Sequence, residues 1–338
     1  MIHKVANILA GDFGGTKTDL AIFSSEAGLE APLAEATFLS ADFPDLETLV
    51  RTFLAQVNVK IERASFGVAG PVVGGQATIT NLPWVIDEAQ LRETLGLLSV
   101  HLLNDLVAVA EAVPFLEPND LYTLNEGEPT KGGTIAVVAP GTGLGEAYLT
   151  WDGKRYRTHA SEGGHADFAP GDQLEMDLLR HLQSRFGHVS TERLCSGKGI
   201  PNIYAFLKES GYAIEPSWMA EQLSMAADPT PVIVNAALDN QHRCELCTAT
   251  LNIFTSILGR EVGNAALRLL ATGGVYLGGG IPPRILAALK NGQFMEAFLY
   301  KGRLSYVLKR VPIYVILNRN AAVLGAARYG FKLAESGC

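Results

Sequence analysis

Two glycine-rich turns, each between two apolar stretches, hold the first residues that could do chemistry. The first turn contains Gly11, Asp12, Gly14, Gly15, Thr16 and Lys17, and the second contains Gly141, Thr142 and Gly143. Glycine permits the positive φ that lets successive backbone N–H groups point at one anion. Asp12 fits beside a phosphate if a divalent cation such as Mg2+ lies between the two negative groups. The chemistry expected here is the binding of nucleotide phosphates with Mg2+.

The repetition of this hairpin distinguishes it from an ordinary tight turn, which either turn alone would suggest as readily. Neither turn has the Gly-x4-Gly-Lys-Ser/Thr pattern of a P-loop or the Gly-x-Gly-x-x-Gly spacing of a dinucleotide site. Two copies of strand, turn and strand indicate a duplicated domain that holds the nucleotide phosphates between its copies.

Asn104 and Asp105 directly follow the apolar stretch 100–103, which is typical of a strand, and precede a helical pattern. In open α/β sheets the reacting groups lie just beyond the carboxyl ends of strands. Asn and Asp are also preferred N-cap residues, so a plain helix cap is the alternative interpretation.

A further group of polar side chains lies in the loop 159–167, which contains His159, Glu162 and His165. These residues could ligate a metal or hydrogen-bond a polyol. Because neither a nearby cysteine nor a His-x3-His spacing supports zinc, we favour the polyol. Glu192 begins a short predicted helix, where it either complements the helix dipole or belongs to the same site.

The elements that must position these residues alternate between strands and helices. Strands are expected at 35–39, 64–69, 100–103 and 311–317, besides those of the two hairpins. Residues 172–262 are predicted to be mainly helical, and a last helix covers about 320–333. A further strand ends in Gly278, Gly279 and Gly280, which would let a flat ring or a phosphate approach the backbone. The alternation, repeated twice, predicts an α/β architecture.

Composition excludes several classes of function. The chain has 338 residues, of which 48% are hydrophobic and 18% charged, so a substantial core is expected. A net charge of −8 argues against a nucleic-acid or anionic-membrane surface. With no apolar run long enough to span a bilayer and four cysteines that make no disulfide framework, we expect a soluble, cytoplasmic protein. Cys244 and Cys247 lie in a helical pattern and are interpreted as core residues rather than a metal or redox site.

Taken in order, these motifs resemble those of the bacterial ATP-dependent glucokinases, within the actin-like sugar kinase superfamily. The resemblance runs along the whole chain. It implies an α/β, ribonuclease H-like fold with two domains and a cleft in which glucose and Mg-ATP meet. The small domain would comprise residues 1–105 and 319–338, and the large domain residues 106–318 with the helical insert. A homodimer is also implied.

The same resemblance implies roles for single residues. The two turns correspond to phosphate loops, and Gly278, Gly279 and Gly280 to the adenosine side. Asp105 matches the catalytic base, which would take the proton of the sugar 6-hydroxyl late in phosphoryl transfer. The residues that match ligands of the sugar hydroxyls are Asn104, Glu162, His165 and Glu192, with Asn81 also near the sugar.

Two residues depart from the family pattern. Lys17 stands where many members carry Asn, and Glu146 stands where a small apolar residue is usual, which adds a negative charge near the phosphate. The alternatives are a kinase for fructose, mannose or an N-acetylhexosamine, a sugar-sensing repressor, and a non-catalytic sugar-binding relative. A repressor would need a DNA-binding segment before the first turn. The presence of both Asp12 and Asp105 favours a kinase over the non-catalytic relative.

Overall fold

The computed structural model describes residues 7–26, 28–29, 31–79, 82, 84–239 and 241–335. The chain divides into two compact units. The first contains Met1–Pro118, Arg157–Ala160 and Asn318–Cys338, and the second contains Asn119–Tyr156 and Ser161–Leu317. The first unit extends beyond residue 105 because the helix that begins there packs on the C-terminal helix.

A five-stranded sheet in the order β3-β2-β1-β4-β8 forms the centre of the first unit. β1 (Asn7–Phe13), β2 (Lys17–Ser24) and β3 (Ala34–Leu39) are antiparallel neighbours. β4 (Arg63–Val68) pairs in parallel with β1, and β8 (Ser99–Asn104) pairs in parallel with β4. The register aligns the carboxyl ends of β1, β4 and β8 at one edge, where chemistry is expected in α/β sheets.

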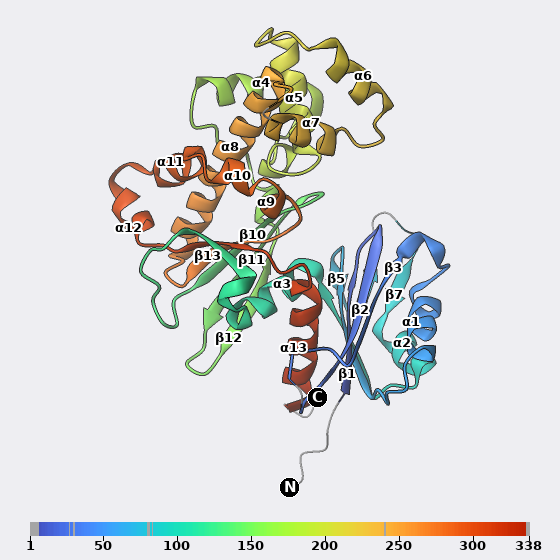
Figure 1. Cartoon of the computed structure of the whole chain (residues 1–338). Coiled ribbons are helices and arrows are strands. Elements are labelled where there is room, and N and C mark those ends of the chain that lie inside the picture. The colour runs from blue at the N-terminus through green and yellow to red at the C-terminus, as the bar shows by residue number, and fades with distance from the viewer. Residues whose placement is uncertain are drawn as a thin grey trace. The chain divides into compact units, whose positions relative to one another are not determined.

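Helices cover both faces of this sheet. α1 (Leu46–Ala55) and α2 (Glu88–Leu95) contribute to the core that contains Leu9 and Phe13 of β1. α3 (Asp105–Ala112) and α13 (Ala321–Glu335) contribute to the core on the other side, which contains Ala10. This division follows from the alternation of side chains along a strand. Figure 1 shows α13 beside β1, although these elements are at opposite ends of the chain.

Close packing of α3 on α13 depends on small residues. A Cβ atom added at Gly325 of α13 would lie 1.7 Å from the carbonyl oxygen of Ala108 in α3. The two helix backbones therefore meet at a distance that only glycine permits at this position. α3 is held in this way beneath the edge where β1, β4 and β8 end.

Short elements complete the first unit. They are β5 (Val72–Val73), β6 (Gln76–Thr78) and β7 (Val85–Asp87), which form an antiparallel three-stranded sheet, and the 3-10 turns η1 (Ser40–Asp42) and η2 (Val113–Phe115). A further turn, η3 (Pro118–Asp120), leads into the second unit.

The second unit contains a six-stranded sheet in the order β12-β11-β10-β13-β14-β9. Its strands are β9 (Leu121–Asn125), β10 (Ile135–Pro140), β11 (Leu144–Trp151), β12 (Tyr156–Ser161), β13 (Gly274–Leu277) and β14 (Ile313–Ile316). β10 is antiparallel to β11 and parallel to β13, as β1 is antiparallel to β2 and parallel to β4. The repeated hairpin predicted from the two turns is therefore confirmed.

Helices make up the rest of the second unit. They are α4 (Gln173–Phe186), α5 (Gly199–Glu209), α6 (Ser217–Met225), α7 (Pro229–Leu238), α8 (Glu245–Leu269), α9 (Ile281–Arg284), α10 (Leu286–Leu289), α11 (Gln293–Leu299) and α12 (Ser305–Lys309), with 3-10 turns η4 (Gly163–His165), η5 (Thr191–Arg193) and η6 (Gly302–Leu304). α8 is the long helix among α5, α7 and α10 in Figure 1, and most of its side chains are buried. Among the described residues, no helix has the length and apolar character needed to cross a membrane.

Candidate functional site

Two acidic side chains lie together at the carboxyl edge of the parallel strands in the first unit. Asp12 is near the end of β1, and Asp105 is the first residue of α3, directly after β8. Gly67 of β4 lies between them: a Cβ atom there would be 3.6 Å from Asp12 Oδ1 and 3.7 Å from Asp105 Cα. The tightest contact of such a Cβ atom would be Ala108 Cβ of α3 at 3.1 Å, so the glycine lets α3 pack closely on β4 beside both acids. Gly67 was missed from the sequence, although a glycine inside a strand often marks such a close approach.

The environment of this carboxylate pair favours the protonated forms. Burial, together with the charges of Asp105 and Asp19, raises the pKa of Asp12 from 3.8 to about 7. Burial also raises the pKa of Asp105, although hydrogen bonds to its carboxylate oppose the shift. The pair therefore has an excess of negative charge in a poorly solvated place, which a cation would relieve.

Asn104 is the N-cap residue of α3. Its Oδ1 accepts hydrogen bonds from Leu106 N at 3.0 Å and Val107 N at 3.3 Å, and its Nδ2 donates to Gly70 O at 3.1 Å. Asp105 Oδ1 accepts a further bond from Leu106 N at 2.8 Å. The cap interpretation is thus confirmed for Asn104, whose role as a sugar ligand stays a prediction.

The first glycine turn is closed by hydrogen bonds around its tip. Gly14 N donates to Lys17 O at 2.9 Å, and Ser40 Oγ donates to Gly14 O at 2.9 Å. The positive φ that we expected is wrong for Gly11 and Gly14, which lie outside the left-handed region. Gly11 is required because a larger residue would not fit: a Cβ atom there would lie 2.6 Å from Leu20 Cδ2. Gly15 is half-buried, and Thr16 and Lys17 are exposed at the tip.

The second glycine turn lines a cavity of about 900 Å3 in the second unit. Gly141 and Thr142 form part of its wall together with Gly280, so residues from two separate predicted motifs meet here. The wall also contains the cationic side chains of Lys198 and Arg284. A cavity with glycine backbone and two cations can accept a phosphorylated ligand.

The glycines at the end of β13 have different roles. Gly278 N donates to Val138 O at 3.0 Å and so continues the pairing with β10. Gly279 has a φ of +79°, and a Cβ atom there would lie 2.6 Å from Pro140 O. These contacts bring Gly280 to the cavity wall beside the second turn.

A third group of predicted residues gathers around Leu144, the first residue of β11. Leu144 N donates to Glu192 Oε2 at 2.9 Å, and Gly143 lacks the Cβ atom that would lie 2.4 Å from the same oxygen. Glu192 belongs to the short 3-10 helix Thr191–Arg193, where a short helix was expected. Glu162 Oε2 and His165 Nε2 lie 3.8 Å apart, and both side chains are exposed. Exposed polar groups of this kind suit a ligand rich in hydroxyl groups.

Two residues of the large cavity were not predicted from the sequence, and one predicted residue is not described by the structure. Lys198 and Arg284 line the large cavity but were not predicted, although the Gly197–Gly199 break between helices was visible. Asn81 lies outside the described residues. Among the residues that are described, no group of three or more His, Cys, Asp or Glu side chains could hold a metal ion.

Glu146 does not line the cavity that contains Gly141 and Thr142. Its side chain is buried in the second unit, where it adds no exposed charge to the glycine turn. Cys244 and Cys247 are also fully buried, at the start of α8, and Cys247 Sγ lies 3.7 Å from Met219 Sδ.

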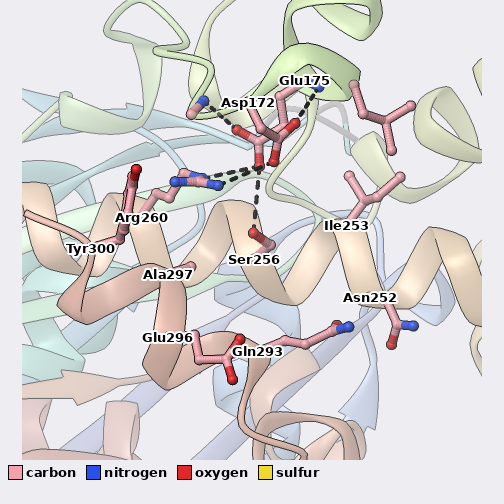
Figure 2. A pocket seen from close by; sticks show the side chains of 12 residues that line it. Asp172, Glu175, Asn252, Ile253, Ser256, Arg260, Gln293, Glu296, Ala297 and Tyr300 are labelled. Carbon is pink, nitrogen blue, oxygen red and sulfur yellow. Dashed lines mark hydrogen bonds and ion pairs between the residues drawn. The ribbon is translucent and has the colours of Figure 1, made fainter.

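Another pocket, of about 460 Å3, contains none of the predicted site residues (Figure 2). Its arginine is already paired with two carboxylates: Arg260 Nε lies 3.1 Å from Glu175 Oε1, and Arg260 Nη2 lies 3.2 Å from Asp172 Oδ2. This arrangement fastens α4 to α8. The pocket therefore differs from the cavity at the second glycine turn, where no ion pair to Lys198 or Arg284 is found among the described residues.

The chain is similar to known glucokinases over most of its length. The glucokinase family model matches residues 9–332. A glucokinase of Nostoc punctiforme is 40% identical over 335 residues, which cover 95% of this chain and 97% of that protein, and one of Psychromonas ingrahamii is 38% identical with 95% and 96% covered. The crystal structure of a glucokinase from an Antarctic psychrotroph has a TM-score of 0.85 at 33% identity, covering 97% of this chain and 100% of that one.

Proposed function

This chain belongs to the glucokinase family, and from that premise we propose that Asp105 is the base in its ATP-dependent phosphorylation of glucose. The reaction transfers a phosphoryl group from ATP to the sugar. The observation that supports Asp105 most strongly is its position at the carboxyl edge of the parallel strands, beside a second carboxylate. Its Oδ1 is oriented by the Leu106 N–H at 2.8 Å.

Asp105 would orient the 6-hydroxyl of glucose and take its proton late in the transfer. Burial raises the pKa of this carboxyl group, which makes it a better proton acceptor than an exposed Asp. An alcohol remains far less acidic than any carboxyl group, so the proton leaves only as the bond to phosphorus develops. Positioning is therefore the larger part of the contribution of Asp105.

Asp12 is the residue that fits Mg2+. A divalent ion near its carboxylate would offset the repulsion from Asp105 and Asp19, which is part of what raises its pKa to about 7. Mg2+ commonly uses one or two carboxylates, with waters and phosphate oxygens as its other ligands. When bound, the ion would neutralise the charge of the phosphates.

The sugar would be bound through Glu162, His165 and Glu192, with Asn104 and Asn81 as further ligands. Glu192 is anchored to Leu144 N, while Glu162 and His165 are exposed and available to hydroxyl groups. Carboxylates accept hydrogen bonds from hydroxyls, and His165 can donate or accept. Such a site would discriminate among sugars because a missing hydroxyl leaves a polar group unpaired.

The nucleotide would use the glycine turns and the cavity of about 900 Å3 in the second unit. Lys198 and Arg284 are the candidates for contact with its phosphates, and the glycine backbone at Gly280 would lie against the adenosine. Gly11 to Lys17 would provide the other phosphate loop. We further propose a homodimer in the cytoplasm, as the family resemblance implies.

The assignment is tested by measuring ADP release with Mg-ATP for glucose, mannose, fructose and N-acetylglucosamine. In the Asp105→Asn variant, turnover should fall by about a thousandfold or more because the proton acceptor is lost. Its dissociation constant for glucose should stay within about tenfold, since the amide keeps the shape and one acceptor.

Asp45→Asn is the matched control, because Asp45 is the exposed N-cap residue of α1 and Asn caps equally well. Its turnover should equal that of the unmodified protein. An Asp105→Asn variant that keeps its turnover, or that loses glucose binding instead, would contradict the role of base. A preference for one of the other sugars would mean that the substrate is that hexose rather than glucose.

A further inference from the structure

Two carboxyl groups lie buried inside the second unit. Glu146 on β11 is 9% exposed, and Glu261 on α8 is 4% exposed. Glu261 has partners: Arg268 Nη1 lies 3.1 Å from its Oε1, and Asn264 Nδ2 donates to its Oε2 at 3.2 Å. Glu146 Oε1 is buried without a hydrogen-bond partner. An unpaired buried carboxylate is costly, so this group requires an explanation.

The buried position of Glu146 is better explained by a protonated, neutral carboxyl group than by a charged carboxylate. Burial and the charge of Glu261 raise the pKa of Glu146 to about 7. Glu261 has a cation and an amide donor beside it, whereas Glu146 Oε1 has no partner, so Glu146 is the member of the pair whose charged form is disfavoured. In that form the carboxyl group of Glu146 can donate a hydrogen bond to Glu261.

The surroundings of the pair contain two cations, Arg268 and Lys301, and the thiol of Cys195. A cavity of about 100 Å3 adjoins Glu146 and is lined by Arg268, Ser161 and Gly163 among others. The buried thiol of Cys195 also faces the pair, and its pKa is raised by burial and by both carboxylates. Lys301 acts on Glu261 from the other side, where its Nζ donates to Asn264 Oδ1 at 2.6 Å. Arg268 is the cation that acts on Glu146, and its effect is smaller than those of burial and of the Glu261 charge.

Glu146 lies directly beneath the turn that carries His165. A Cβ atom at Gly163 would be 2.0 Å from Glu146 Oε2, so the carboxyl group rests against the backbone of this turn. A Cβ atom at Gly164 would be 2.1 Å from Leu144 O, which shows the same close contact one residue later. The turn η4 therefore packs directly on β11 through Gly163 and Gly164, and the carboxyl group of Glu146 is part of this contact.

We propose that Glu146, in its protonated form, is a positioning residue that holds the turn Gly163–His165 in place for sugar binding. Loss of the proton would set two negative charges against each other beneath this turn, and the turn would move away from β11 to admit water. The inference rests on the proposed sugar-binding role of Glu162 and His165. Its consequence is weaker glucose binding at alkaline pH.

The test is the dissociation constant for glucose, measured by calorimetry without nucleotide between about pH 6 and about pH 8.5. Only the protonated fraction would bind, so the dissociation constant of the unmodified protein should rise by up to about 30-fold over this range. Glu146→Gln imitates the protonated group and should keep the tight binding at every pH. Glu175→Gln is the control, since Glu175 is an equally buried acid of the same unit but is held by Arg260 (Figure 2).

Glu175→Gln should follow the pH dependence of the unmodified protein. Should the unmodified protein show no dependence, or should Glu146→Gln show the same dependence, the proposal would be overturned. Gly163→Ala provides a second approach, because its methyl group would displace the turn and weaken glucose binding at every pH. Failure of the sugar-site assignment would be seen separately, as Glu162→Gln and His165→Ala variants that bind glucose normally.

Discussion

Replacing Glu146 with Gln should make the stability of the protein less dependent on pH. Glu146 is the acid whose buried Oε1 has no hydrogen-bond partner, and burial is the first cause of its raised pKa. The substitution keeps the shape of the side chain and removes the ionisation. Arg268 and Asn264 remain paired with Glu261, so the variant leaves no partner stranded.

The magnitude follows from the pKa. In the folded protein it rises from 4.5 to about 7. Below about pH 4.5 both folded and unfolded forms hold the proton, whereas between there and about pH 7 only the folded form does, so the free energy of unfolding falls as the pH rises. At about 1.4 kcal/mol for each pH unit, the total effect is about 3 kcal/mol. Between about pH 5.5 and about pH 8.5, it is about 2 kcal/mol.

Calorimetric unfolding at these two pH values measures the effect. The advantage of Glu146→Gln over the unmodified protein should grow by about 2 kcal/mol from the lower to the higher pH, or about 4–8 °C in Tm for a domain of this size. Glu175→Gln should instead lower Tm at both pH values, because Arg260 would lose a buried partner. A Glu146→Gln variant whose Tm falls with pH as steeply as that of the unmodified protein would refute the reasoning.

Three other changes test the remaining features. Gly325→Ala should lower the free energy of unfolding by about 3 kcal/mol, because its methyl group would overlap the carbonyl oxygen of Ala108. Gly330→Ala on the same helix should be nearly neutral, because its methyl group would lie 3.2 Å from its nearest neighbours. Denaturant unfolding compares the two variants. Arg284→Ala should raise the KM for ATP about tenfold and leave that for glucose unchanged in steady-state kinetics, and equal effects on both would contradict a nucleotide contact. Asp12→Asn should lower kcat by about 100-fold or more and yet raise the Tm of the ligand-free protein, because one of two neighbouring buried charges is removed; a lower Tm would count against this account of Asp12.

Local sequence patterns correctly predicted where several candidate site residues lie relative to the strands and helices. The strand that ends at Asn104 and the helix that begins at Asp105 follow from an apolar stretch succeeded by two capping residues. The two glycine turns each join antiparallel strands, as the repeat indicated. Such features depend on residues close together in the chain, where propensity and periodicity act directly.

Features that depend on packing in three dimensions could not be predicted. Gly11 and Gly14 are needed for space rather than for positive φ, since their neighbours come from the facing strand and the turn itself. The hydrogen bond that Glu192 accepts from Leu144 N joins residues 48 positions apart, and no local pattern predicts it. The cationic side chains of the large cavity come from segments that only folding brings beside Gly141.

The sequence by itself determined the order of the elements, the repeated hairpin and the residue types available for phosphoryl transfer. Only the tertiary structure decided which charges meet. Asp12 and Asp105 are 93 positions apart in the numbering, and Glu146 and Glu261 are 115 apart, yet each pair is close enough in the fold to shift a pKa. The physical reason is that electrostatic energy depends on distance and solvation in space, and neither quantity is encoded in the local pattern around a residue.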